Sequence, residues 1–212
     1  MADSNDEVPK CAFFAAGTAT MSTVPSPKHQ LRVTDDEIVD RATALYLAAR
    51  PIDMSSLAAD LGLSRATLYR RVGNHEDLLG TVLSAQTEAT FRSVRRPRDV
   101  HGLTAVTTTL EAFIHAIMAS APVRSLIERD AALFIRVVMG RGPVEDSASR
   151  MIAELLEEEL SGQLDADPAL LARAIVRLSD AMIYTHLLGD SEPEVDEAVT
   201  LVRMLLDAAV GR

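Results

Sequence analysis

Apolar side chains recur every three or four residues over most of this chain, which is the spacing that buries one face of an α-helix. No segment alternates apolar and polar residues as a half-buried strand does, and no internal repeat is found. Prolines and glycines separate the periodic segments, so the pattern predicts an all-α fold. The expected helices cover residues 35–49, 54–61, 65–72, 75–95, 103–117, 131–139, 147–160, 168–188 and 194–210, and Pro122 suits the first turn of a further helix.

The first four expected helices carry start and stop signals. Thr34 and Glu37 have the spacing of a capping box, in which each side chain bonds the other residue's backbone N–H. Gly62 follows the second helix at the position where a left-handed backbone commonly ends one. The N-caps expected for the other three helices are Asp53, Ser64 and Asn74.

Composition agrees with a helical protein that has a sizeable core. Hydrophobic residues make up 48% of the 212 residues and aromatic residues only 4%, and the dominant Ala and Leu are good helix formers. We divide the chain into a flexible arm over residues 1–30, a first helical domain over 31–80 and a second helical domain over 81–212. The prolines and small polar residues of the first segment suggest the arm, although its apolar patch at 12–16 could dock on the body.

The sequence carries no signal for export, a cofactor or catalysis. Cys11 is the only cysteine, so no disulfide can form within the chain. The acidic N-terminus does not fit a secretory signal, and no apolar run is long enough to span a bilayer. The five histidines show no metal-ligand spacing, and no nucleophile or phosphate-loop motif is found. We therefore expect a cytoplasmic protein without metal or cofactor that is not an enzyme.

Charge is unevenly distributed along the chain, whose net charge is −10. Residues 54–98 hold seven arginines against four acidic residues, a net charge of +3. Residues 101–212 hold nine arginines against eighteen acidic residues, a net charge of −9. A basic head can meet a phosphate backbone while the acidic body is held away from it. Arg92, Arg95, Arg96 and Arg98 are more simply a solvated helix face than a DNA contact.

The segment Met54–Leu79 predicts two short helices joined by a tight turn. Ala58 is small where the helices would cross, and Leu68 is one of the leucines spaced to bury between them. The second helix then exposes cations, hydroxyls and a small residue, which suits the major groove of DNA. The residues expected to contact DNA are Ser64, Arg65, Ala66, Thr67, Tyr69, Arg70 and Arg71. The alternative is an ordinary helical hairpin whose arginines face solvent.

The residues from Leu57 to Leu78, LAADLGLSRATLYRRVGNHEDL, resemble the TetR/AcrR family of bacterial regulators. The family's head typically reads I-A-x-x-A-G-V-S-x-G-T-L-Y-x-H-F-x-S-K-E-x-L, and the likeness extends over about residues 34–83. It implies a further contact to the DNA backbone at the family's lysine position, which is His75 here, and Val72 replaces the usual aromatic residue. The pattern Leu-Tyr-Arg-Arg-Val-Gly is similar to a subgroup that includes repressors of quorum-sensing lactone degradation in actinobacteria.

The resemblance also implies that residues 31–80 are a helix-turn-helix DNA-binding domain and that residues 81–212 are a ligand-binding and dimerisation domain, with a pocket inside the C-terminal helices. A mostly apolar effector with hydrogen-bond acceptors, such as a lactone or acyl compound, would occupy it, and Arg136 could pair with a carboxylate if it points inward. The expected lining residues are His115, Met118, Phe134, Met139, Met182, Tyr184 and His186. Each of these residues could instead serve an ordinary core.

The same resemblance implies a homodimer through residues 168–210, where Ile175 and Leu205 belong to two strongly apolar helices. Two heads on a two-fold axis match a palindromic operator in double-stranded DNA, whereas an internal core pair in a monomer is the alternative. The leading hypothesis is a repressor that a small-molecule effector releases from its operator. The rival is a helical small-molecule-binding or interaction protein with a non-functional DNA head, and neither hypothesis involves a membrane.

Overall fold

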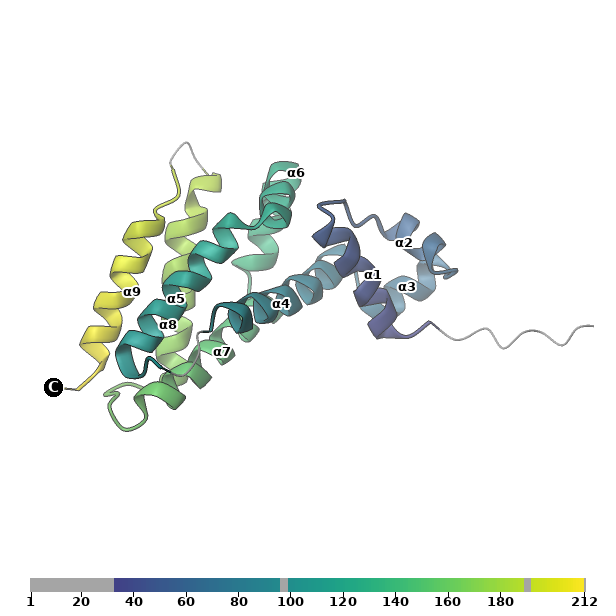
Figure 1. Cartoon of the computed structure of the whole chain (residues 1–212). Helices are drawn as coiled ribbons and strands as arrows, with labels where there is room; N and C mark the ends of the chain where they lie inside the picture. Colours follow the sequence, from purple (N-terminus) through teal and green to yellow (C-terminus); the bar gives the residue numbers. More distant parts are fainter. Residues whose placement is uncertain (1–32, 96–98, 189–191, 212) are drawn as a thin grey trace, which may run out of the picture. The chain divides into compact units, whose positions relative to one another are not determined.

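The computed structural model describes residues 33–95, 99–188 and 192–211, so the arm predicted over residues 1–30 lies outside the described part, as do Arg96 and Arg98. Within the described part, nine α-helices and one 3-10 helix follow one another, and the only β pairing is an isolated bridge between Leu164 and Val210. The all-α prediction is confirmed. Figure 1 shows the helices in chain order.

The first three helices form a small reading head: α1 (Asp35–Leu47), α2 (Met54–Asp60) and α3 (Arg65–Val72). Their local signals act as the sequence predicts. The hydroxyl of Thr34 accepts from the backbone N–H of Glu37 at 3.1 Å, and the Glu37 carboxylate accepts from the Thr34 N–H at 2.6 Å. Asp53 and Ser64 cap α2 and α3. Gly62 has φ +65°, the left-handed backbone that lets the chain turn between these two helices.

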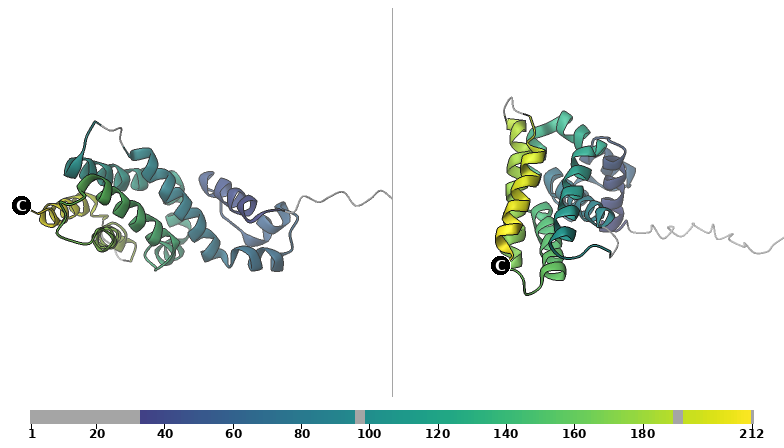
Figure 2. Two further views of the ribbon diagram at one scale, coloured as in Figure 1. Left: turned by 90° about the horizontal axis from the view of Figure 1, so that it is seen from below. Right: turned by 60° about the vertical axis from the view of Figure 1, so that its left-hand side comes forward.

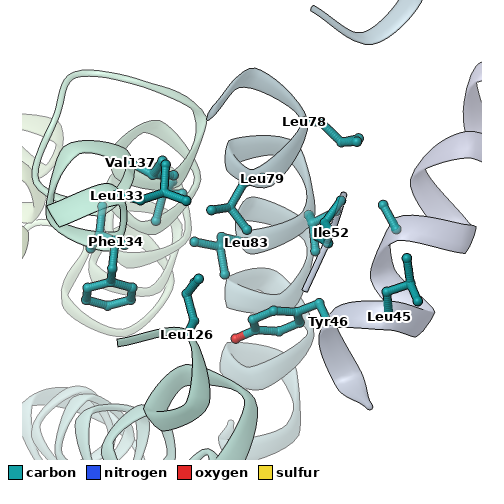
Figure 3. Packing of buried hydrophobic residues seen from close by; sticks show 14 of the residues in the cluster. Leu45, Tyr46, Ile52, Leu78, Leu79, Leu83, Leu126, Leu133, Phe134 and Val137 are labelled. Carbon is teal, nitrogen blue, oxygen red and sulfur yellow. The ribbon is translucent and has the colours of Figure 1, made fainter. Parts of the chain in front are cut away.

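Helix α4 (His75–Val94) begins almost directly after α3, because Gly73 ends α3 at φ +74° and Asn74 starts α4. Asn74 and Asp77 form a second capping box. The domain boundary expected between residues 80 and 81 falls inside this continuous helix. One buried cluster joins the head to the rest of the chain, with Leu79 and Leu83 of α4 lying between Tyr46 on one side and Phe134 on the other (Figure 3).

The remaining helices pack as a bundle: α5 (Gly102–Ala119), α6 (Ala121–Val138), α7 (Pro143–Leu160), α8 (Pro168–Tyr184) with the 3-10 helix η1 (Thr185–Leu188), and α9 (Val195–Ala209). Three predicted boundaries were wrong. The helix expected to begin at Pro122 and the helix expected over 131–139 form one element, α6, whose two halves are separated by non-helical φ/ψ at Asp130. Helix α7 starts at Pro143 instead of 147, because proline fits a first helical turn. Helix α8 tightens into η1 after Tyr184.

Helix α5 corrects the expectation that no apolar run is long enough to span a bilayer. By length and composition alone it could cross a membrane, with a mean hydropathy of 1.3, although the sequence analysis expected no such run. In the structure it is a bundle helix in contact with α4, α7 and α9. Its buried residues Val106, Leu110 and Phe113 join a second core cluster, where the rings of Phe113 and Phe91 meet edge to face at 5.2 Å. Apolar character here serves internal packing.

Loss of the Asn74 cap should loosen the start of α4. We expect Asn74→Ala to lower the free energy of unfolding by about 1 kcal/mol, since the Asp77 backbone N–H loses the side-chain oxygen that accepts from it. Asn74→Asp keeps an accepting side chain and is the matched control, with little change expected. Urea titration followed by circular dichroism measures both variants. Equal stability of Asn74→Ala and the unsubstituted chain would show that the Asn74 side chain contributes nothing as a cap.

Candidate DNA-reading helix and ligand cavity

Helix α3 presents one polar face to solvent and one apolar side chain to the core. Leu68 is fully buried beneath α1 and α2, while Arg65, Ala66 and Arg70 are exposed and Tyr69 is 40% exposed. Positions 65, 66, 69 and 70 share a helix face because 3.6 residues make one turn. The structure therefore groups two cations, a phenol and a small residue on the surface that the sequence predicted to contact DNA.

Ser64 and Thr67 lie at the N-terminal end of that face. The Ser64 hydroxyl accepts from the Thr67 backbone N–H at 3.1 Å, and the two hydroxyl oxygens are 2.8 Å apart. This pairing fixes both side chains at the positive end of the short helix. One hydroxyl donates its proton to the other, so one proton of the pair is left to donate to a phosphate oxygen.

Arg71 and His75 do not join this exposed face. The Arg71 Nε donates to Asp35 Oδ1 of α1 at 2.5 Å, and its side chain is only 23% exposed, so it holds the head together instead. His75 is half-buried and lines a small cavity with Tyr46, Leu79 and Leu133, among others. The order of α3 and α4 along the chain did not indicate these contacts, because the acidic first turn of α1 and the position of α6 are set by the tertiary structure.

A cavity of about 270 Å³ lies within the bundle and reaches α1 of the head. It is lined by residues of α1, α4, α5, α6, α7 and α8, so every described α-helix except α2, α3 and α9 contributes. Its apolar wall consists of Leu47, Leu83, Leu110, Phe113, Ile114, Ile117, Pro122, Val123, Phe134, Val138, Val144, Ala148, Ile152, Ile175, Val176 and Ile183. A concave, mostly apolar space with a few polar groups is typical of a small-molecule site.

Two of the seven predicted pocket residues line this cavity. They are Phe134 and Tyr184, whose rings meet edge to face at 5.0 Å. The other five do not: His115 is exposed on α5, and His186 in η1 has its Nδ1 only 2.6 Å from the Ile183 carbonyl oxygen. The three methionines, Met118, Met139 and Met182, are partly buried against the core outside the lining. Arg136 points away from the cavity and bonds Glu76 of α4 at 2.8 Å.

The polar side of the cavity, which α4, α7 and α8 supply, was not predicted from the sequence. The residues concerned are Gln86, Thr87, Thr90, Glu145, Ser179 and Asp180, with Ser120 between α5 and α6. One signal was available, because Asp180 is the only acidic residue within the otherwise apolar and basic helix α8. No comparable signal marks Glu145, which follows Pro143 in an acidic first turn that looks like ordinary helix-end chemistry.

The acidic groups of the cavity differ in how they are compensated. Glu145 is buried and holds a bidentate ion pair with Arg177, with both Arg177 nitrogens 2.9 Å from its oxygens. Asp180 lines the same cavity, and burial, reinforced by the negative charge of Glu145, raises its pKa to about 7. Burial also raises the pKa of Tyr46 to about 12 and that of Tyr184 further, so both phenols stay protonated and able to donate.

Comparisons with known proteins agree with this architecture. Residues 101–207 match the family model described as "Tetracyclin repressor-like, C-terminal domain". The chain is similar to the solved TetR-family transcriptional repressor QsdR of R. erythropolis, with 35% identity, a TM-score of 0.77, and 84% of this chain and 96% of that chain covered. The TetR-family repressor AlkX of Dietzia sp. shares the fold at 21% identity and a TM-score of 0.58, covering 85% and 99% of the two chains. No curated protein sequence matches.

Asp180 should make stability depend on pH. An aspartate in an unfolded chain has a pKa of about 3.9, whereas Asp180 in the folded protein has a pKa of about 7. Between these values the folded state binds the proton more strongly, so the free energy of unfolding falls as pH rises. Asp180→Asn replaces the titrating carboxyl with a group that does not ionise. The melting temperature of the variant minus that of the unsubstituted chain should therefore increase from pH 5 to pH 8.

Differential scanning calorimetry of both proteins across this pH range measures the effect. Asp146→Asn, which alters an exposed carboxylate of α7, is the matched control and should show no such trend. A difference between Asp180→Asn and the unsubstituted chain that stays constant with pH would mean that Asp180 ionises normally.

Proposed function

The chain belongs to the TetR family of ligand-responsive, DNA-binding transcriptional regulators, and from this premise we propose that it is a repressor that leaves its operator when a small molecule fills the cavity. The observation that carries the proposal is the course of α4. Its first residue lies three positions after the end of α3, and its middle residues Leu83, Gln86, Thr87 and Thr90 line the cavity. A ligand that displaces α4 therefore acts on the helix that positions α3.

A second connection joins the cavity to the head through α6. The Arg129 guanidinium donates to the Ala49 carbonyl oxygen at 2.8 Å, just after α1 ends. The Tyr46 ring of α1 packs against Leu126 of α6 and lines the cavity itself (Figure 3). Movement of α6 on ligand binding would reach α1 as well as α4, so the head would turn as a unit. Such coupling between two sites is typically worth about 1–3 kcal/mol.

For DNA, we propose that Arg65, Tyr69 and Arg70 make the main contacts, with Ser64 and Thr67 at the helix end and Ala66 allowing close approach. Arg71 and His75 contribute by organising the head. Acidic residues dominate the C-terminal part, which favours an orientation with only the head on the phosphate backbone. The proposed division is a head up to residue 80 and a sensing and dimerisation domain from residue 81, meeting inside α4.

We propose a homodimer through α8 and α9, which lie side by side in the views of Figure 1 and Figure 2. Each helix leaves a stripe of accessible apolar side chains at helical spacing, and family members are dimers. The stripes consist of Leu170, Ala174, Leu178 and Ala181 on α8, and Leu201, Met204, Leu205 and Ala208 on α9. The expectation for Ile175 changes, because it is 2% exposed and lines the cavity. A charge there would disrupt the core instead of an interface.

The proposed effector is a small apolar molecule, with acyl compounds and lactones as first candidates, and the proposed location is the cytoplasm, where the DNA is. Family members are generally not enzymes, and we propose no catalytic role for this chain.

The rival hypothesis, a small-molecule-binding protein whose head no longer reads DNA, is disfavoured by Arg65 and Arg70. Among the described residues neither guanidinium has an acidic partner within 4.0 Å, so both are available to phosphates.

Removal of the Arg70 guanidinium should weaken DNA binding. We expect Arg70→Ala to reduce affinity for the protein's own upstream DNA by roughly tenfold or more, and to make the salt dependence shallower by about one ion per head. Fluorescence anisotropy over a salt series measures both quantities. Arg92→Ala, an exposed arginine near the other end of α4, is the control and should retain full affinity. Unchanged binding by Arg70→Ala would place the docking surface elsewhere.

A charge within the apolar stripe of α9 should break the dimer. Met204 is 60% exposed in the single chain, so Met204→Glu costs little in the monomer but would bury a carboxylate in the proposed interface. Light scattering should then give a monomer mass at micromolar concentration, with helical content unchanged. Val100→Glu changes a 42% exposed apolar residue outside the stripes and should leave the dimer intact. A Met204→Glu dimer as stable as the unsubstituted one would exclude this interface.

A further inference from the structure

The polar edge of the cavity lacks a cation. Its lining includes two acidic residues, Glu145 and Asp180, and no Lys, Arg or His. The guanidinium of Arg177 reaches Glu145, but its side chain is 48% exposed and is not part of the lining. A carboxylate or phosphate entering the cavity would therefore approach negative groups in a largely apolar surrounding, where repulsion is poorly screened.

Two adjacent groups of α8 are left without partners inside this space. Ser179 is 8% exposed, and its hydroxyl oxygen has no hydrogen-bond partner among the described residues. None of the residues that the structure describes donates a hydrogen bond to Asp180 either. Glu145 differs, because its two oxygens are satisfied by Arg177. Buried polar groups are nearly always paired in native proteins, so an unpaired serine beside an unpaired carboxyl in a cavity indicates a missing partner.

The missing partner must donate hydrogen bonds. Above its pKa of about 7 Asp180 is mainly ionised and accepts only, and a serine hydroxyl can both accept and donate. The remaining wall is apolar along α5 and α6, which suits a hydrocarbon body. A head with N–H or O–H groups would satisfy Asp180 and Ser179, whereas an ester, a simple lactone or a carboxylate offers only acceptors.

We propose that the ligand of this cavity is a small apolar molecule whose polar head donates hydrogen bonds to Asp180 and Ser179, as an ammonium or an amide does. This inference rests on the proposed function and specifies its effector class. Among acyl compounds and lactones it selects those that carry an N–H group. It excludes free fatty acids and esters as preferred ligands.

The test uses four compounds that share an eight-carbon chain: octylamine, octanamide, methyl octanoate and octanoate. Calorimetric titration of the full-length protein at pH 8, without DNA, should show octylamine or octanamide binding at least about tenfold more tightly than methyl octanoate, because a bond to a buried carboxylate is stronger than a neutral one. Octanoate should bind weakest. Equal or tighter binding of the ester or the carboxylate, or no binding by any of the four, would overturn the proposal.

Two substitutions at Asp180 test whether this residue causes the preference for the nitrogen compounds. They also distinguish the charged donor octylamine from the neutral donor octanamide. Asp180→Leu should remove it for both nitrogen compounds, whereas Asp180→Asn keeps an accepting oxygen and should weaken octylamine alone. Asp146→Asn is the control, with the preference unchanged. A preference that survives Asp180→Leu would place the polar head elsewhere. Release from DNA is measured separately by anisotropy, so a donor preference without DNA release would support the ligand class and contradict ligand-controlled repression.

Discussion

The close packing of α4 against α7 is the constraint on which the rest of the structure depends. Gly80 lets the helices approach so closely that a Cβ atom at this position would lie 3.1 Å from the ring of Pro143. One turn further, the hydroxyls of Ser84 and Ser147 are 2.7 Å apart. Glu88 then accepts from Ser147 and Arg150, and the Arg150 bond holds the pKa of Glu88 below its usual value. These contacts hold α4 along the sensing bundle while its first turn starts at the reading head.

The contact between α4 and α7 also places the start of α7 between α4 and the cavity. Residues 143–148 present Val144, Glu145 and Ala148 to the cavity, and Pro143 and Ser147 to α4. Because closely packed helices rearrange between discrete packings, a molecule that moves this segment would displace α4 as a body. The bidentate pair of Glu145 with Arg177 extends the connection to α8, whose outer stripe is the proposed dimer surface. Effector, partner subunit and DNA head would thus act on one connected set of helices.

The cavity keeps groups that a fully packed core would exclude. Asp180 and Ser179 lie among leucines, isoleucines and phenylalanines, where an unpaired polar group costs roughly 1–3 kcal/mol. That cost also raises the pKa of Asp180 towards neutrality. A bound hydrogen-bond donor would remove this cost. Asp180 and Ser179, which lower the stability of the protein without ligand, would then contribute to ligand affinity. This arrangement links stability, pH and ligand binding through one residue.

The sequence by itself determined the fold class and the local structure of the head. Capping at Thr34, Asp53, Ser64 and Asn74, the left-handed turn at Gly62 and the buried Leu68 all depend on residues within one or two turns, so short-range signals suffice. Only the tertiary structure decided which side chains enter the cavity. His115 lies outside and Asp180 inside because, in helices apolar on several faces, spacing identifies a buried face without saying which neighbour covers it. The pairing of Arg71 with Asp35 was hidden for the same reason, since no pattern along the chain joins residues 36 positions apart.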